Sequence, residues 1–293
     1  MPSEGLSAAQ LAVAAQKGVE LAEAVVAERA AAAAGAEALP GSAGIVVAEG
    51  DSWFDYPFHD VLKELRGRFG FRVESVAHHG DTAEGIAYDR SQLDRFAGKL
   101  EELRDSGLVP RAILISAGGN DIAGTEFALL LNHRASGLDP LNEDIVRGAI
   151  DIRLRAALVS ILFGVSTLSQ HYFGVVVPIL VHGYDFPVPD GRGVLGGFWL
   201  LPGPWLEPGF RRKGYDDVLQ NVLEMQRLMD RLNGVLEAVP LLPGLSHVRY
   251  VDLRGSLSST PASYRTDWAN ELHPTGRGFE AVARRFNAVL AQL

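Results

Sequence analysis

The sequence contains no cysteine among its 293 residues, so disulfide bonds, thiol nucleophiles and zinc sites with cysteine ligands are excluded. It also lacks a run of about 18 consecutive apolar residues, the length that a membrane-spanning helix requires. Basic residues are fewer than acidic residues, with 27 Lys and Arg against 36 Asp and Glu, and the net charge is −9. A nucleic-acid backbone is therefore not an expected partner.

The first ten residues, MPSEGLSAAQ, lack the basic stretch and the apolar core of a secretory signal. We therefore take the cytoplasm as the default location, although a trimmed, secreted form would have the same sequence features. Hydrophobic residues make up 47% of the chain and charged residues 22%, which is typical of a soluble globular protein. The length suits a single α/β domain.

Short apolar runs alternate with segments of helical spacing from residue 45 onward. The runs that read as buried strands are 45–48, 71–77, 112–117, 175–183 and 247–253. The segments that read as helices are 57–69, 86–105, 143–171, 216–238 and 277–293. This alternation predicts a parallel sheet that is covered by helices on both faces.

The N-terminal part of the chain has a different composition. Residues 7–38 are rich in alanine and contain no proline, and Ser7 with Gln10 forms a capping-box pattern, so one long helix is expected here. We divide the chain into a helical extension, residues 1–40, and an α/β domain, residues 41–293.

Small and polar residues stand directly after each predicted strand. They are EGDS at 49–52, HHGDT at 78–82, GGND at 118–121, HGYD at 182–185 and, after a longer loop, DWANELHP at 267–274. Because the carboxyl ends of parallel strands meet at one edge of a sheet, where ligands bind, we expect these turns to form one site.

Four of these motifs carry a resemblance to a known family. GDSW at 50–53, Gly80 within HHGDT, GGND at 118–121 and HP at 273–274 resemble, in this order, the four sequence blocks of the SGNH (GDSL-type) hydrolases. The resemblance covers residues 45–293. It implies a three-layer α/β/α fold with a five-stranded parallel, flavodoxin-like sheet. It also implies a serine esterase or lipase-like acyl hydrolase, which cleaves carboxylic esters through an acyl-enzyme and needs no cofactor.

By this resemblance Ser52 is the nucleophile, His273 is the general base, and Ser52, Gly80 and Asn120 form the oxyanion hole. A serine hydroxyl needs a base to accept its proton, and histidine serves near neutral pH. We therefore expect activity to fall as the pH drops through the histidine range, which lies near about 6.5 before any shift of the pKa. We also expect Gly80 to allow a close backbone approach, and a helix beginning near Ser52 to add the positive end of its dipole.

One position departs from the family pattern. The family has an acidic residue three positions before the histidine, and here that position is Asn270. Three alternatives follow: Asn270 orients His273 directly, Asp267 supplies the carboxylate, or a backbone carbonyl orients the base and leaves a Ser-His dyad. We favour Asn270, because it keeps the family spacing.

Two other classes of function compete with the esterase. The neutral Asn270 is consistent with a binding protein on a catalytically decayed hydrolase scaffold. His78 and His79 lie close in sequence to several aspartates, which suggests a metal-dependent phosphoesterase. Because no histidine or aspartate pair has the spacing of metal ligands, we expect no metal site.

The segment 186–210 is a long loop rich in glycine, proline and aromatic residues. Long loops of this kind are usually functional or disordered, and the aromatic content argues against disorder. It is expected to be either an apolar lid or acyl-binding wall, or a loop packed on the protein body or a partner subunit. Trp53, Trp199 and Trp205 are candidate contacts for a small-molecule or lipid-like ester.

Overall fold

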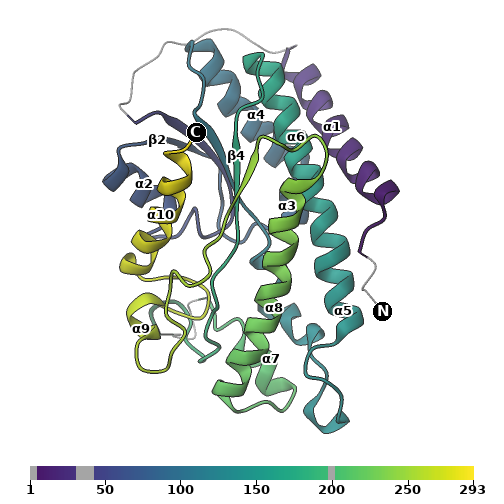
Figure 1. Cartoon of the computed structure of the whole chain (residues 1–293), viewed down its shortest axis with the longest axis vertical. Helices are drawn as coiled ribbons and strands as arrows, with labels where there is room; N and C mark the ends of the chain where they lie inside the picture. The colour runs from purple at the N-terminus through teal and green to yellow at the C-terminus, as the bar shows by residue number, and fades with distance from the viewer. Residues whose placement is uncertain (1–4, 31–42, 197–201) are drawn as a thin grey trace.

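The computed structural model describes residues 5–30, 43–196 and 202–293, and Trp199 lies outside these ranges. Five parallel strands form one sheet in the order β2-β1-β3-β4-β5 (Figure 1). The strands are β1 (Ile45–Gly50), β2 (Arg72–Ser75), β3 (Ala112–Ser116), β4 (Ile179–His182) and β5 (Val248–Val251). This confirms the expected flavodoxin-like sheet, with the strands that precede the GDS and GGND motifs side by side at its centre.

Helices cover both faces of the sheet, which completes the expected three layers (Figure 1). On one face α2 (Val61–Phe69) packs against α10 (Gly276–Leu290). The other face carries α3 (Ala83–Tyr88), α4 (Arg90–Asp105), α6 (Arg155–Phe173) and α8 (Val218–Ala238). Every residue of β1, β3 and β4 is buried, because these central strands are covered on both sides.

The first helix, α1 (Ala8–Ala30), packs along the outside of α6 (Figure 1). The two helices approach closely at Gly18, where a Cβ atom would lie 2.0 Å from the backbone oxygen of Ser160. Arg29 also pairs with Asp94 at 3.0 Å and with Glu101 at 2.8 Å on α4. The sequence-based division of the chain at residue 40 stays a prediction.

The helix that follows β1 starts later than the sequence suggested. It begins at Val61 with Asp60 as its N-cap, so Pro57 is not in its first turn and Phe58 is 65% exposed. Residues 51–55 form a separate turn, in which the N–H groups of Phe54 and Asp55 donate to the Asp51 carbonyl. No described helix begins at Ser52, and the expected helix-dipole contribution there is wrong.

Two other predicted helices are interrupted. The segment 86–105 divides at Asp89, which ends α3 and caps α4. The segment 143–171 consists of α5 (Glu143–Val146), a π-helical stretch (Arg147–Leu154) and α6. The remaining short α-helices are α7 (Glu207–Arg212) and α9 (Tyr264–Asp267). None of the helices in the described ranges combines the length and the apolar character of a membrane crossing.

Candidate active site

Ser52, His273 and Asn270 lie in hydrogen-bond contact although 221 positions separate the serine from the histidine. The Oγ atom of Ser52 is 2.7 Å from Nε2 of His273. The Nδ1 atom of His273 is 3.1 Å from Oδ1 of Asn270. All three residues are buried. This arrangement fits a neutral imidazole that donates its Nδ1–H to Asn270 and accepts the serine proton at Nε2.

The side-chain amide of Asn270 is held in one orientation. Its oxygen also accepts the backbone N–H groups of Leu272 at 3.0 Å and of His273 at 2.9 Å. Its nitrogen donates to the hydroxyl of Tyr56 at 3.0 Å, and the Tyr56 ring stacks on the imidazole with 4.2 Å between centroids. A flipped amide would set its NH2 group against these donors, so the oxygen must face the histidine. Sequence reasoning missed Tyr56, and no local pattern marks it.

Burial lowers the pKa of His273 to about 3. Desolvation disfavours the charged imidazolium, and no carboxylate in the described part of the chain contacts the ring to offset this effect. His273 is therefore neutral, and able to accept a proton, far below the ordinary histidine range. The expected fall of activity with pH is thereby moved from the unshifted value near about 6.5 to lower pH.

Asp267 is directed away from His273. Its Oδ2 accepts the backbone N–H of Ser258 at 2.9 Å, and its Oδ1 lies 3.5 Å from Nε of Arg277. The alternative in which Asp267 supplies the triad carboxylate is therefore not supported. The side chain of Asn270, rather than a backbone carbonyl, is the partner of the imidazole Nδ1.

The loop that carries Gly80 is tied on both sides to the other motifs. Before it, the N–H of His79 donates to Asp55 in the turn after the nucleophile at 3.1 Å. After it, the carbonyl of Asp81 accepts Nδ2 of Asn120 at 2.9 Å. One hydrogen of that amide is thus used, and the second is left for a ligand.

The backbone N–H groups of Ser52 and Gly80 donate to no acceptor within the described ranges. Gly80 has φ +89°, a left-handed conformation that favours glycine, and a Cβ there would meet no protein atom within 4 Å. Backbone conformation favours glycine at this position, and the open space around it is compatible with the expected close approach of the backbone to a ligand. With Asn120, these groups form a candidate set of oxyanion donors.

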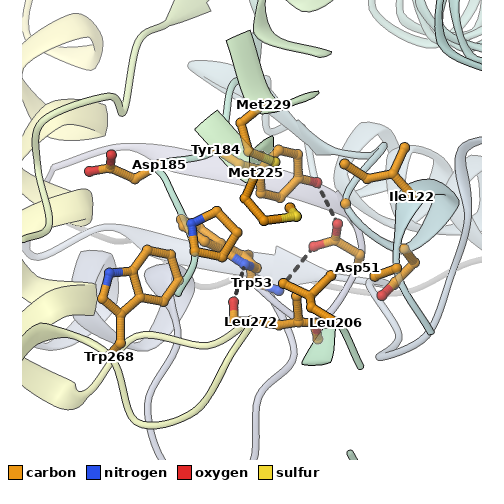
Figure 2. Close-up of a pocket in the computed structure, with 15 residues that line it drawn as sticks. Asp51, Trp53, Ile122, Tyr184, Asp185, Leu206, Met225, Met229, Trp268 and Leu272 are labelled. Atoms are coloured by element: carbon orange, nitrogen blue, oxygen red, sulfur yellow. Dashed lines mark hydrogen bonds between the residues drawn. The ribbon is translucent and has the colours of Figure 1, made fainter. Parts of the chain in front are cut away.

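A buried polar network surrounds Asp51 in the turn of the nucleophile. Oδ1 of Asp51 accepts the N–H of Trp53 at 2.9 Å, and Oδ2 accepts the hydroxyl of Tyr184 (Figure 2). Oδ1 also accepts the hydroxyl of Ser116 at 2.6 Å. The Ser116 hydroxyl is also 2.7 Å from Nε2 of His182, which is completely buried. Every oxygen of the Asp51 carboxylate therefore has a partner, which keeps the turn fixed.

Burial lowers the pKa of His182 and raises the pKa of Tyr184, because desolvation disfavours the charged form of each side chain. Sequence analysis did not identify the side-chain partners of Asp51. The HGYD motif after β4 was the available signal, since it places Tyr184, which donates to Asp51, and His182, which contacts Ser116, at the active edge of the sheet.

A cavity opens beside Ser52 (Figure 2). Its apolar lining includes Met225 and Met229 from α8, together with Ile122, Leu206, Trp268 and Leu272. The two carboxylates in the lining, Asp51 and Asp185, are already satisfied; Asp185 accepts three backbone N–H groups, from Phe186, Gly255 and Leu257. The cavity therefore offers a ligand chiefly apolar contact.

The two described tryptophan candidates lie close to the site. Trp53 lines the cavity and donates its Nε1–H to the carbonyl of Leu272 at 3.1 Å. Trp205 stands edge-on to the imidazole of His273, with 5.5 Å between ring centroids.

Asp121, the last residue of GGND, is a further titratable group near the site. Burial raises its pKa to about 6, and the backbone N–H of Ala83, which donates to Oδ2 at 2.9 Å, partly offsets this effect. Asp121 therefore changes its charge near pH 6, where His273 stays neutral.

His78 and His79 are exposed and stack on each other with 4.4 Å between ring centroids. Nδ1 of His79 lies 3.1 Å from Oδ2 of Asp55, and Nδ1 of His78 lies 3.7 Å from Oδ1 of Asp81. Across the described ranges, no three histidine, aspartate or glutamate side chains gather as a metal ion would require. This geometry does not favour the phosphoesterase alternative.

The chain matches no protein-family model and no curated protein sequence. It is similar to the extracellular lipase of Streptomyces rimosus, with 16% identity, a TM-score of 0.46 and coverage of 84% of this chain and 99% of that chain. It is also similar to a catalytic mutant of an acetylxylan esterase from Geobacillus stearothermophilus, with 18% identity, a TM-score of 0.45 and coverage of 86% and 95%.

A third similar structure is a member of the lipolytic G-D-S-L family from Veillonella parvula, with 12% identity, a TM-score of 0.45 and coverage of 85% of this chain and 99% of that chain. Several of the structures that the chain is similar to are thus lipases or esterases, and two of them are described as GDSL-like or G-D-S-L proteins, all at low sequence identity. At these identities and scores, the likeness assigns no role to any residue of this chain.

Proposed function

We propose that the protein is a serine hydrolase of carboxylic esters that works through an acyl-enzyme. The observation that carries this proposal is the continuous hydrogen-bonded row from Ser52 through His273 to Asn270. A hydroxyl in contact with a neutral, oriented imidazole is the arrangement that activates a serine nucleophile. The apolar cavity beside the hydroxyl supports an ester with an apolar acyl group.

In the first half of the reaction, Ser52 Oγ attacks the ester carbonyl carbon and His273 Nε2 accepts the serine proton. The negative charge on the carbonyl oxygen is stabilised by the N–H groups of Ser52 and Gly80 and the amide of Asn120. The tetrahedral intermediate then expels the alcohol oxygen, which takes the proton from His273. The acyl group remains on Ser52.

In the second half, a water molecule transfers a proton to His273 and attacks the acyl carbon. Collapse of the second intermediate releases the carboxylic acid and returns the proton to Ser52. The imidazolium forms twice in each cycle, and Asn270 orients it without supplying a charge. Formation of this cation in a buried site is therefore expected to cost more than in an aspartate triad.

The test is hydrolysis of p-nitrophenyl acyl esters by the wild type and by Ser52→Ala. We expect the variant to lose at least about 10³ in kcat, because the nucleophile is removed. Labelling by a fluorophosphonate should occur in the wild type and not in the variant. Equal hydrolysis by the two proteins would rule out the serine mechanism.

The neutral Asn270 supports a second candidate function, that of a binding protein on a catalytically decayed hydrolase scaffold. That candidate predicts an unlabelled Ser52 and no Ser52-dependent turnover, while a small-molecule ligand still binds in the cavity. A metal-dependent phosphoesterase would instead lose its activity on treatment with a chelator and would not label. The same panel of measurements therefore separates all three functions.

A further inference from the structure

Glu271 is completely buried, and no lysine, arginine or histidine in the described part of the chain pairs with it. Its two oxygens instead accept four backbone N–H groups. Oε1 accepts those of Gly191 at 3.0 Å and of Glu207 at 2.9 Å. Oε2 accepts those of Trp205 at 2.6 Å and of Leu206 at 2.7 Å. The buried carboxylate of Glu271 thus holds four backbone N–H groups in place.

The four donors come from the two ends of one segment, Gly191 at its start and residues 205–207 at its end. One carboxylate therefore fixes both ends. The start of the segment is bound again, because the N–H of Glu271 donates to the carbonyl of Arg192 at 3.2 Å. The guanidinium of Arg192 in turn donates to the carbonyls of Trp268 and Ala269, each at 3.1 Å. The segment and the loop of the base form one hydrogen-bonded unit.

The end of the segment that Glu271 binds carries two side chains close to the reacting groups. The Trp205 ring stands 5.5 Å, centroid to centroid, from that of His273. Leu206 is 1% exposed and lines the cavity beside Ser52. We call this pair the Trp205–Leu206 wall. Its backbone N–H groups are the two that make the shortest bonds to Glu271.

We propose that Glu271 is a positioning residue that fixes the Trp205–Leu206 wall, and that this wall limits the length of the acyl group that the enzyme accepts. The inference rests on the proposed esterase function. The substrate class is an ester with an uncharged aliphatic acyl chain. The lining of the cavity is chiefly apolar and its carboxylates are already hydrogen-bonded to protein, which favours an aliphatic chain over a charged one.

Glu271→Gln tests this role with little change of shape. Glutamine offers one oxygen, so its NH2 group must face two of the four backbone donors. We expect the wall to lose its fixed position, and the selectivity between the preferred acyl chain and a longer one to fall about tenfold, mainly through KM. The readout is kcat and KM on p-nitrophenyl esters from acetate to decanoate, normalised by fluorophosphonate titration of active sites.

A double-mutant cycle with Trp205→Ala shows whether Glu271 acts through the wall. The double variant should have the same chain-length profile as Trp205→Ala alone. Asp89→Asn is the matched control, because Asp89 also accepts a backbone N–H, that of Ser91 at 2.8 Å, but caps α4 outside the cavity lining. Its profile should equal that of the wild type.

An equal loss for every ester in Glu271→Gln, or an unchanged profile, overturns the proposal. Should this variant fail to fold, Trp205→Ala and Leu206→Ala decide, and unchanged profiles in both overturn it as well. Failure of the proposed function looks different, because the wild type would then show no Ser52-dependent hydrolysis of any ester in the series.

Discussion

The turn that carries Ser52 and the loop that carries His273 are held in place by different means. The turn extends a central strand, and the N–H of Asp51 donates to the carbonyl of Ser116 on the neighbouring strand at 3.1 Å. The loop between α9 and α10 has only an isolated bridge between Trp268 and Pro274 as regular structure. Its geometry depends on the side chains of Asn270 and Glu271.

This difference predicts how substitutions will act on the two halves of the site. The nucleophile half, the turn that carries Ser52, is hydrogen-bonded to the central strands of the sheet. A lost bond there should therefore lower the free energy of unfolding. The base half, the loop that carries His273, is irregular and has no strand pairing beyond the Trp268–Pro274 bridge, so a lost bond there should lower activity more than stability.

The largest loss of activity is expected from a substitution in the loop that carries His273. In Asn270→Ala the imidazole loses its Nδ1 partner, and the wrong tautomer becomes accessible, so kcat should fall by about 10²–10⁴. Steady-state hydrolysis of p-nitrophenyl esters measures the change, and circular dichroism checks that the fold is kept. A fall of less than about threefold would mean that Ser52 and His273 act as a dyad.

Asn120 is a candidate oxyanion donor that belongs to neither half. Asn120→Ala removes one candidate oxyanion donor, so kcat should fall by about 10²–10³ with little change in KM. Asn142→Ala is the matched control, because Asn142 caps α5 by accepting the N–H of Ile145 at 3.2 Å. The control should lower stability without lowering kcat. Equal kinetic effects of the two variants would remove Asn120 from the oxyanion hole.

A pair of tyrosine variants compares the halves directly. Tyr184→Phe leaves one oxygen of the buried Asp51 carboxylate without its donor, and the free energy of unfolding should drop by about 1–3 kcal/mol. Tyr56→Phe removes only the acceptor of the Asn270 amide, and it should lower kcat more than stability. Urea unfolding and ester kinetics on both variants give the comparison. The reverse order would contradict it.

The smallest expected effect is a shift of the pH profile. Because burial lowers the pKa of His273 to about 3, kcat/KM should not fall through this residue near pH 6.5. Asn270→Asp adds a carboxylate beside the imidazole, favours the charged form, and should move the acid limb to higher pH. A fall near pH 6 in the wild type would come from Asp121, whose pKa is about 6, and should disappear in Asp121→Asn.

The stability of the folded protein must be measured over the same pH range as its activity. The pKa of His273 is lower in the folded protein than in the unfolded chain, so the unfolded state binds more protons between about pH 6.5 and 3. This residue therefore makes the folded state less stable as the pH falls through that range. Thermal unfolding at each pH separates this loss from a true loss of catalysis. An acid limb at the same pH in the wild type and in Asn270→Asp would contradict the pKa argument.

The sequence predicted the strands and the turns at their ends well, because buried central strands are continuous apolar runs. It predicted the helix boundaries less well. Pro57 and Phe58 fit a helical pattern, yet the chain makes a separate turn first and α2 begins only at Val61. Periodicity shows which residues share a face, but it does not show where a competing local turn interrupts the helix.

The contacts that orient the base were beyond the sequence. Tyr56 and Asn270 are 214 positions apart, and nothing near either residue signals their hydrogen bond. Asn270 and Asp267 were both open choices, because each lies a short distance before the histidine. Only the folded loop directs Asp267 to Ser258 and Asn270 to His273.

By itself, the sequence determined the order of strands and helices and the identity of the motifs at the strand ends. These features follow from local patterning and from the geometry of parallel sheets. The tertiary structure alone decided how deeply His273 is buried, and therefore its pKa, and which backbone groups the Glu271 carboxylate accepts. Both depend on segments that are distant in sequence, because desolvation and hydrogen-bond partners are set by the neighbours that folding brings together.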